Sequence, residues 1–243
     1  TTRFNPIEAA EKNYRDRVSR TFNTVGALTW NIKQGLSFRS SFGFQYQYTE
    51  DGRFYGTGTG AANANGNLPV VSWGMTQTPR WQMSNVLNYN FKLHSLHDIQ
   101  LMVGQEMKNQ TSVNKTYTTR YFPIAITGEK ALSNLALGTP LANNSTEGSP
   151  NRISSFFGRA SYGYDDRYLA AFTVRADGST QFGPSNRWGV FPSASFAWRM
   201  SNEAFLKDSK TVSNLKIRLS YGVSGNDRIS SDLYAKYYGV SQN

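Results

Sequence analysis

The two histidines of the chain, His94 and His97, stand three residues apart, and Asp98 follows the second. Imidazole and carboxylate groups can bind a metal ion, but a site needs three or four convergent ligands and a second shell that orients them. The residues from His94 to Asp98 separate two apolar runs and are typical of a solvated turn. We therefore expect no metal ion here. The chain also lacks cysteine, which excludes a disulfide framework and cysteine metal sites.

The other residues that could do chemistry have simpler interpretations. Asp165 and Asp166 are paired carboxylates, but neighbouring side chains in a strand or turn normally diverge, so we interpret them as turn formers. The stretch Gly56–Gly60 superficially resembles a phosphate-binding loop, yet it lacks the buried strand and following helix that such a loop needs. It is interpreted as a flexible loop. No Ser/His/Asp arrangement can be placed, and the sequence predicts neither an enzyme nor a cofactor.

A group of aromatic and basic residues is a better candidate for binding. Arg53, Phe54, Tyr55 and Trp73 fall in a Gly- and Asn-rich stretch, 49–79, that reads as a long loop. Exposed aromatic rings with polar neighbours suit sugars or peptides, which they bind by stacking and hydrogen bonding. The alternative is that these rings pack the loop onto itself or onto a partner. Both interpretations stay open at this stage.

The elements that would carry these residues are long, two-faced strands. Between positions 36 and 48 every even position except Ser40 is apolar or aromatic, and the odd positions are polar or glycine. Successive strand side chains point to opposite faces, so this segment has one apolar and one polar face. A soluble strand usually has about 5–6 residues, whereas a strand that crosses a bilayer needs about 9–11. The pattern therefore predicts a transmembrane β-barrel.

The same alternation recurs along most of the chain and predicts about eight strands. The alternating segments span 22–32, 36–48, 81–93, 99–107, 156–164, 168–174, 188–200 and 215–223. Residues 1–19, 49–79, 119–150 and those after Gly225 are expected to be loops, and 201–214 could hold one helical turn. Short turns at one end and long loops at the other are typical of outer-membrane barrels.

Two details of the strands matter for this prediction. Aromatic side chains stand near strand ends, where membrane-interface girdles would fall: Tyr46, Tyr48, Trp81, Tyr162, Tyr164, Tyr168, Trp188 and Trp198. Pro192 lies inside a predicted strand, and we expect a bulge or a local break there, set by Phe191–Ser193, because proline cannot donate to the ladder. A soluble β-sandwich with strands buried on one side is the alternative fold.

Composition agrees with a barrel. Hydrophobic residues make up 38% of the chain and the mean hydropathy is −0.53, so no apolar helix spans a membrane. The net charge of +10 is compatible with a nucleic-acid partner, but the basic residues are dispersed along the chain rather than clustered. We expect no nucleic acid. The polar face would line a wet lumen, and a basic lumen favours anionic or polar solutes. Its expected residues are Arg39, Gln45, Gln47, Arg175, Arg199 and Arg218.

The segment from Arg159 to Arg228 resembles the SusC/RagA-type TonB-dependent outer-membrane transporters of Bacteroidetes. The matching motifs, in order, are Arg159–Leu169, Val174–Ser179, Phe182–Gly183, Arg187–Ser193, Ala197–Arg199, Glu203–Leu206, Leu215–Gly222 and Ser224–Asn226. They cover less than a third of the chain, but several motifs in the right order are specific. The preceding region is similar only in its general barrel character.

The resemblance implies a plugged barrel of about 22 strands that imports glycans or peptides across the bacterial outer membrane. It also implies a SusD-like surface lipoprotein as a lid and energy from the TonB complex through an N-terminal plug. Asp177–Ser179 and Phe191–Ser193 are interpreted as architectural rather than as substrate contacts.

We expect residues 1–243 to be part of a single outer-membrane barrel domain: an all-β, antiparallel segment of about eight strands from a larger plugged barrel. No plug, TonB-contacting segment, signal peptide or closing strand is recognisable in the sequence, so the chain is expected to be an internal slice of a larger protein. Two alternatives remain, a small complete barrel acting as an adhesin or anchor, and a soluble β-sandwich carbohydrate-binding module.

Overall fold

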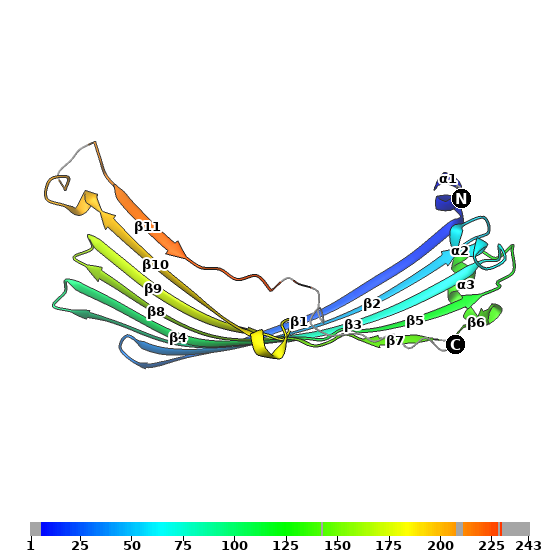
Figure 1. The fold of residues 1–243 in the computed structure, drawn as a ribbon, viewed down its shortest axis with the longest axis horizontal. Helices are drawn as coiled ribbons and strands as arrows, with labels where there is room; N and C mark the ends of the chain where they lie inside the picture. Colours follow the sequence, from blue (N-terminus) through cyan, green and yellow to red (C-terminus); the bar gives the residue numbers. More distant parts are fainter. Residues whose placement is uncertain (1–5, 142, 208–210, 228, 230–243) are drawn as a thin grey trace. The chain divides into compact units, whose positions relative to one another are not determined.

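The computed structural model describes residues 6–141, 143–207, 211–227 and 229. The strands form one antiparallel sheet with the order β1-β2-β3-β4-β8-β9-β10-β11 (Figure 1). These eight strands are β1 (Asn13–Lys33), β2 (Leu36–Tyr55), β3 (Val70–Leu93), β4 (His97–Gln110), β8 (Asn151–Tyr164), β9 (Tyr168–Ser179), β10 (Trp188–Arg199) and β11 (Lys216–Gly222). In the described part of the chain the pairing order begins at β1 and ends at β11.

Short elements complete the chain. They are α1 (Pro6–Lys12), α2 (Gly60–Asn63), α3 (Gly128–Ser133), η1 (Leu135–Leu137), η2 (Pro184–Asn186), η3 (Met200–Asn202), β5 (Val113–Arg120), β6 (Thr139–Pro140) and β7 (Asn144–Glu147). No helix in the described residues combines the length and the apolarity needed to cross a membrane.

The chain divides into two compact units. The first unit comprises 1–23, 45–80 and 111–149, and the second comprises 24–44, 81–110 and 150–243. Strands β1, β2 and β3 each contribute residues to both units.

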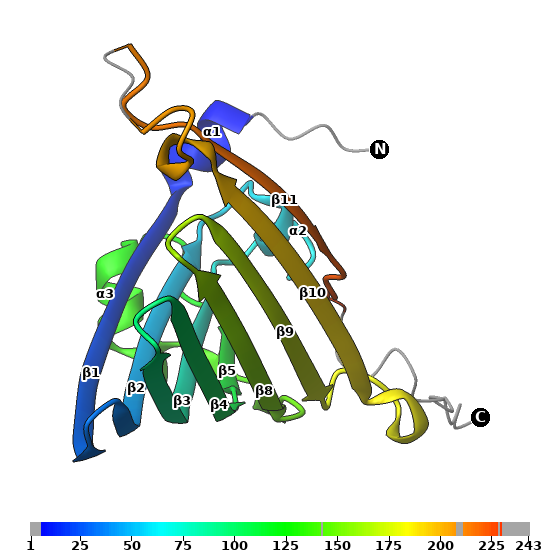
Figure 2. The ribbon, with the colours of Figure 1, turned by 90° about the vertical axis from the view of Figure 1, so that its left-hand side faces the viewer.

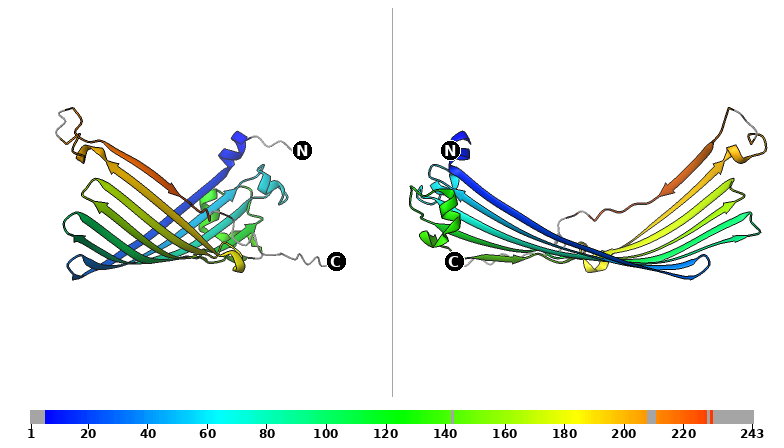
Figure 3. Two further views of the ribbon diagram at one scale, coloured as in Figure 1. Left: turned by 60° about the vertical axis from the view of Figure 1, so that its left-hand side comes forward. Right: turned by 180° about the vertical axis from the view of Figure 1, so that it is seen from behind.

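The second unit is a regular antiparallel ladder. Strands β4, β8, β9 and β10 lie side by side in that order (Figures 2 and 3), and β11 pairs with the far side of β10. The turn between β8 and β9 holds Asp165 and Asp166 with φ of 49° and 51°. Two successive residues with positive φ match the right-handed twist of the flanking strands. This confirms that the two carboxylates are turn formers.

The first unit has a small apolar core beside its strands. Phe54 of β2 and Val71 of β3 pack with Phe122, Ala131 and Leu132, all of them buried. Thr59 caps α2, and its hydroxyl accepts a hydrogen bond from the amide of Ala62 at 3.3 Å. In Figures 1 and 3, α2 and α3 lie at the loop ends of β2 and β3. Residues 56–69 and 121–141 are therefore folded connections.

The structure confirms the all-β class and corrects several boundaries. Strand β1 begins at Asn13, so part of the expected loop 1–19 is strand; residues 1–5 lie outside the described part of the chain. Strands β2 and β3 extend far into the expected loop 49–79, and most of 119–150 forms short elements. The strands exceed the predicted lengths because polar residues continue the ladder beyond the apolar stripe. The Gly56–Gly60 stretch forms a turn that leads into α2, in which the amide of Thr59 donates to the carbonyl of Gly56 at 3.3 Å.

The expected bulge or break at Pro192 is wrong, and the alternative fold is excluded. The pairing of β10 with β9 runs without a bulge from Trp188↔Gly178 to Trp198↔Tyr168, straight through Pro192↔Val174. On the edge of β10 that faces β11, the carbonyl of Pro192 accepts a hydrogen bond from the amide of Val223. The N–H that proline lacks would point to this same edge, where the pairing with β11 ends at Gly222. The β-sandwich is also excluded for the described residues, because their strands form one sheet.

Candidate functional site

One face of the second unit is apolar and exposed. Phe172 of β9 lies directly between Ala160 of β8 and Ala194 of β10, so a large ring alternates with small side chains across the strands. The same alternation places Phe196 opposite Ala170. Phe172 is 54% exposed and Phe196 is 50% exposed. A continuous apolar surface of this kind needs an apolar environment, which a bilayer supplies.

A row of rings crosses the apolar face at its short-turn end. His97, Tyr164, Tyr168 and Trp198 are directly opposite one another on β4, β8, β9 and β10. Successive ring centroids are 5.2, 6.4 and 6.5 Å apart. Aromatic rows at this position form the interfacial girdles of membrane barrels. Three of the eight predicted girdle residues therefore lie in one row.

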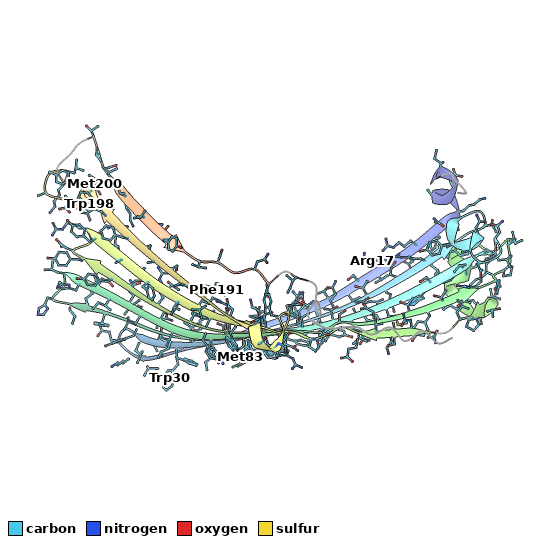
Figure 4. All side chains as sticks on the ribbon, viewed as in Figure 1. Arg17, Trp30, Met83, Phe191, Trp198 and Met200 are labelled. Atoms are coloured by element: carbon cyan, nitrogen blue, oxygen red, sulfur yellow. The ribbon has the colours of Figure 1, made fainter. Side chains whose placement is uncertain are left out.

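The row is anchored by a buried carboxylate. Glu203 follows η3 and accepts hydrogen bonds from the hydroxyl of Tyr168 at 2.7 Å and from the indole Nε1 of Trp198 at 2.9 Å. It also pairs with Arg167 at 3.1 Å. Figure 4 shows Trp198 beside Met200 at the same end of β10. The connection after β10 is thus tied to the turn between β8 and β9.

These bonds change the acidity of Glu203. Hydrogen bonds from Tyr168 and Trp198, followed by the hydrogen bond and the charge of Arg167, lower the pKa of the Glu203 carboxyl below its ordinary value. The ionised carboxylate is therefore the form that the cluster holds. A second ion pair lies beside this cluster: Arg199, at the end of β10, pairs with Asp166 in the turn between β8 and β9.

The opposite face carries a charged network. Arg175 of β9 binds Glu106 of β4 at 2.8 Å and Asp177 at 2.7 Å, and its guanidinium lies 5.5 Å from the ring centre of Phe157. Gly104 makes room for that ring, since a Cβ there would stand 2.4 Å from Phe157 Cζ. Arg175 is thus neutralised and held in place.

The other residues expected in the lumen have different surroundings. Gln47 donates to Ser19 at 3.3 Å in the first unit, and Arg199 is held by Asp166. Arg39 and Arg218 are exposed. No group of three metal-ligating side chains that could hold a metal ion occurs among the described residues.

The proposed binding residues of the first unit lie on strands, not in a loop. Arg53, Phe54 and Tyr55 end β2, and Trp73 is near the start of β3. Phe54 is 5% exposed in the apolar core and Trp73 packs against that core. Arg53 remains accessible and pairs with Asp51 at 2.7 Å. The structure therefore brings the four residues into one region, but Phe54 could meet a solute only if the core opened.

Sequence reasoning missed the charged networks. Arg175 and Asp177 are two apart on one strand, which places both on the same face, and this spacing was a usable signal. The contribution of Glu106 depends on the pairing of β4 with β8 and of β8 with β9, which no local pattern reveals. Glu203 was noted only as part of a family motif.

An antiparallel sheet of long strands, apolar on one face and polar on the other, defines the wall of a transmembrane β-barrel. The chain belongs to the family described as TonB dependent receptor-like, beta-barrel, which matches residues 1–243. Members of this family are outer-membrane proteins.

Individual relatives agree with this assignment. TonB-dependent receptor P3 of Formosa agariphila is 31% identical over 237 residues, which cover 97% of this chain and 23% of the relative. TonB-dependent receptor SusC of Bacteroides thetaiotaomicron is 45% identical over 92 residues, or 37% of this chain and 9% of SusC. These relatives are receptors rather than enzymes, as the sequence predicts.

A solved structure shows the same fold. The chain matches the structure of the RagAB peptide transporter with a TM-score of 0.79 and 21% identity, covering 91% of this chain and 24% of the solved chain. The chain thus spans about a quarter of the length of P3 and of that solved chain.

Proposed function

We propose that the chain is part of the wall of a TonB-dependent importer of glycans or peptides in the bacterial outer membrane. The observation that carries this proposal is the two-faced ladder of the second unit, with exposed Phe172 on one face and the Arg175 network on the other. In this role residues 1–243 belong to a single barrel domain, although they fold as two compact units.

The proposed importer moves solutes without covalent chemistry. Solute is captured at the long-loop end and passes along the polar face once a plug has rearranged. A SusD-like surface lipoprotein covers the entrance, and the TonB complex supplies energy through the plug. The resemblance to SusC/RagA-type transporters implies a glycan or a peptide as substrate, and the fold shared with the RagAB peptide transporter supports a peptide.

Arg53, Tyr55 and Trp73 remain our proposed solute contacts at the ends of β2 and β3. Arg53 and Tyr55 offer hydrogen-bonding groups there, and the half-buried ring of Trp73 offers a surface for stacking. We assign Phe54 a packing role, because it is buried.

The proposal is tested by extracting the protein from outer membranes in detergent, measuring its intact mass and identifying its partners. A chain several times heavier than 27.2 kDa that co-purifies with a surface lipoprotein supports the importer. A heat-modifiable species near 27.2 kDa without partners would instead support the small adhesin or anchor barrel.

A further inference from the structure

A basic trough crosses the polar face of the second unit near its short-turn end. Its floor is one cross-strand row of uncharged side chains, and four cations flank it. The floor residues are Gln100, Ser161, Ala171, Ser195 and Ser220, which pair successively across β4, β8, β9, β10 and β11. The flanking cations are Lys92, Arg159, Lys216 and Arg218. Together they line a cavity of about 590 Å³.

The row makes the floor shallow and long. Adjacent strands are about 4.8 Å apart, so five strands place the two ends of the row about 19 Å from each other. Ser161, Ala171 and Ser195 have short side chains, so their part of the floor is open to an extended molecule. Serine hydroxyls can donate and accept hydrogen bonds, as hydroxyl-rich or carboxylate-rich ligands require.

The cations stand on both sides of this floor. Arg159 is two residues from Ser161 on β8, one row toward the long loops, and it donates to Ser161 at 3.1 Å. Arg218 is two residues from Ser220 on β11, one row toward the short turns, opposite Ala197. A chain lying along the floor would therefore meet a guanidinium on either side, about 7 Å away along the strands.

These charges are not neutralised within the described residues. Lys92, Lys216 and Arg218 are exposed and make no ion pair there. Asp165 and Asp166 also line the trough, but they pair with Arg167 and Arg199. Asp98 is the remaining carboxylate. The trough therefore differs from the Arg175 network on the same face, whose positive charge Glu106 and Asp177 offset.

We propose that the basic trough binds an extended solute bearing several carboxylate groups during import. This inference rests on the proposed importer function and specifies its substrate class. The carboxylates could belong to a uronic-acid oligosaccharide or to an acidic peptide, because both present the same charge to the trough. Exposed cations raise the local concentration of such anions and bind them with charge-assisted hydrogen bonds.

The binding test uses the full-length receptor in detergent with hexagalacturonate and hexa-aspartate as anionic probes. Maltohexaose and hexaserine are their neutral counterparts. We expect one anionic probe to bind at least tenfold more tightly than its counterpart, with an affinity that falls between 0.05 and 0.5 M NaCl. The stronger anionic probe then identifies the source of the carboxylates. Equal affinity for charged and neutral probes would overturn the proposal.

Variants that remove a trough charge test whether the anionic probe binds in the trough. Arg218→Gln should weaken binding of the anionic probe about threefold, and Arg159→Gln with Arg218→Gln about tenfold. Lys108→Gln is the matched control, because it removes a charge from the same face outside the trough. An equal loss in the control would contradict the assignment.

Lysine footprinting needs no variant. An amine-acylating reagent should modify Lys92 and Lys216 in the free receptor, and bound probe should slow their modification while Lys108 is unaffected. If both lysines are unreactive without a probe because another part of the receptor covers them, the trough is not a solute site. Receptor-dependent uptake in cells that does not discriminate solute charge would refute the trough but leave the importer intact.

Discussion

The carboxylate of Glu203 accepts a hydrogen bond from the indole Nε1 of Trp198 at 2.9 Å, across the connection that follows β10. Tyr168 is directly opposite Trp198 and its ring is stacked on the indole. Its hydroxyl donates a hydrogen bond to the same carboxylate oxygen, Glu203 Oε1, at 2.7 Å. One carboxylate therefore joins the ends of β9 and β10 where the membrane interface begins. This relationship gives a residue of the family motif a physical role.

Replacing Glu203 should loosen this end of the sheet. Glu203→Gln keeps the shape of the side chain but removes the charge that pairs with Arg167. We expect a lower midpoint temperature for the loss of the heat-modifiable folded form on gels. Glu147→Gln is the control, because Glu147 is exposed on β7 and has no ion pair within the described residues. Equal midpoints for wild type and Glu203→Gln would show that the cluster contributes nothing.

The same cluster predicts a pH dependence. The pKa of Glu203 is lowered in the folded protein, first by the hydrogen bonds from Tyr168 and Trp198. The resulting stabilisation is complete above the pKa of an unfolded-state glutamate and is lost as pH falls through the folded-state pKa. The midpoint difference between wild type and Glu203→Gln should therefore shrink as pH is lowered from 7 to 3. A difference that stays constant over this range would contradict the assignment.

The two faces of β9 should respond differently to charge. Phe172→Arg places a guanidinium in the middle of the apolar band and should cost about 2–4 kcal/mol of folding free energy in a bilayer. Thr173→Arg places the same charge on the polar face, next to it in sequence, and should be tolerated. Refolding into lipid vesicles at graded denaturant concentration measures both. Similar costs at the two positions would refute the assignment of the faces.

Two strand glycines should differ when they are replaced by alanine. At Gly104 a Cβ would stand 2.4 Å from Phe157 Cζ, and that ring also lies against Arg175. Gly104→Ala should destabilise the sheet by about 1–3 kcal/mol. At Gly26 a Cβ would meet nothing within 4 Å, so Gly26→Ala should be neutral or stabilising by up to about 1 kcal/mol. The comparison uses denaturant unfolding, and a reversed order would contradict the packing around Phe157.

The apolar core of the first unit should hold its connections in place. Phe122 is 1% exposed and packs with Leu132. Phe122→Ala should cost about 3–5 kcal/mol of local stability and expose 121–141 to protease. Ile124→Ala is a control, since Ile124 is 68% exposed in the same connection. Equal cleavage rates for both variants would argue against a packed connection.

The sequence was sufficient for the fold because the period-two alternation is local. Each strand shows its apolar face independently of its partners, and eight paired segments lie close to where the pattern places them. The alternation did not predict the strand ends beyond the apolar stripe, at positions such as Thr49 and Arg53, because a polar strand end has the composition of a loop. It also failed at Pro192, where only the pairing of β10 shows which side lacks a donor.

The candidate sites were harder to predict, because they depend on pairing between distant segments. Glu106 reaches Arg175 across β8, 69 residues along the chain, and Ser161 aligns with Ser220 only through β9 and β10. Strand register is set by the whole ladder and by its turns. Local spacing could propose Arg175 and Asp177 as neighbours, but it could not identify their third partner.

The central claim, that this sheet is a membrane-spanning wall, is tested most directly by spin labels on β9. Residues 1–243 contain no cysteine, so single cysteines at Phe172, Thr173, Val174 and Arg175 can be labelled one at a time within lipid vesicles, in a full-length receptor whose other segments are kept free of cysteine. Labels at 172 and 174 should collide preferentially with dissolved oxygen, and labels at 173 and 175 with a water-soluble nickel chelate. Collision rates that show no period of two along these four positions would contradict the account.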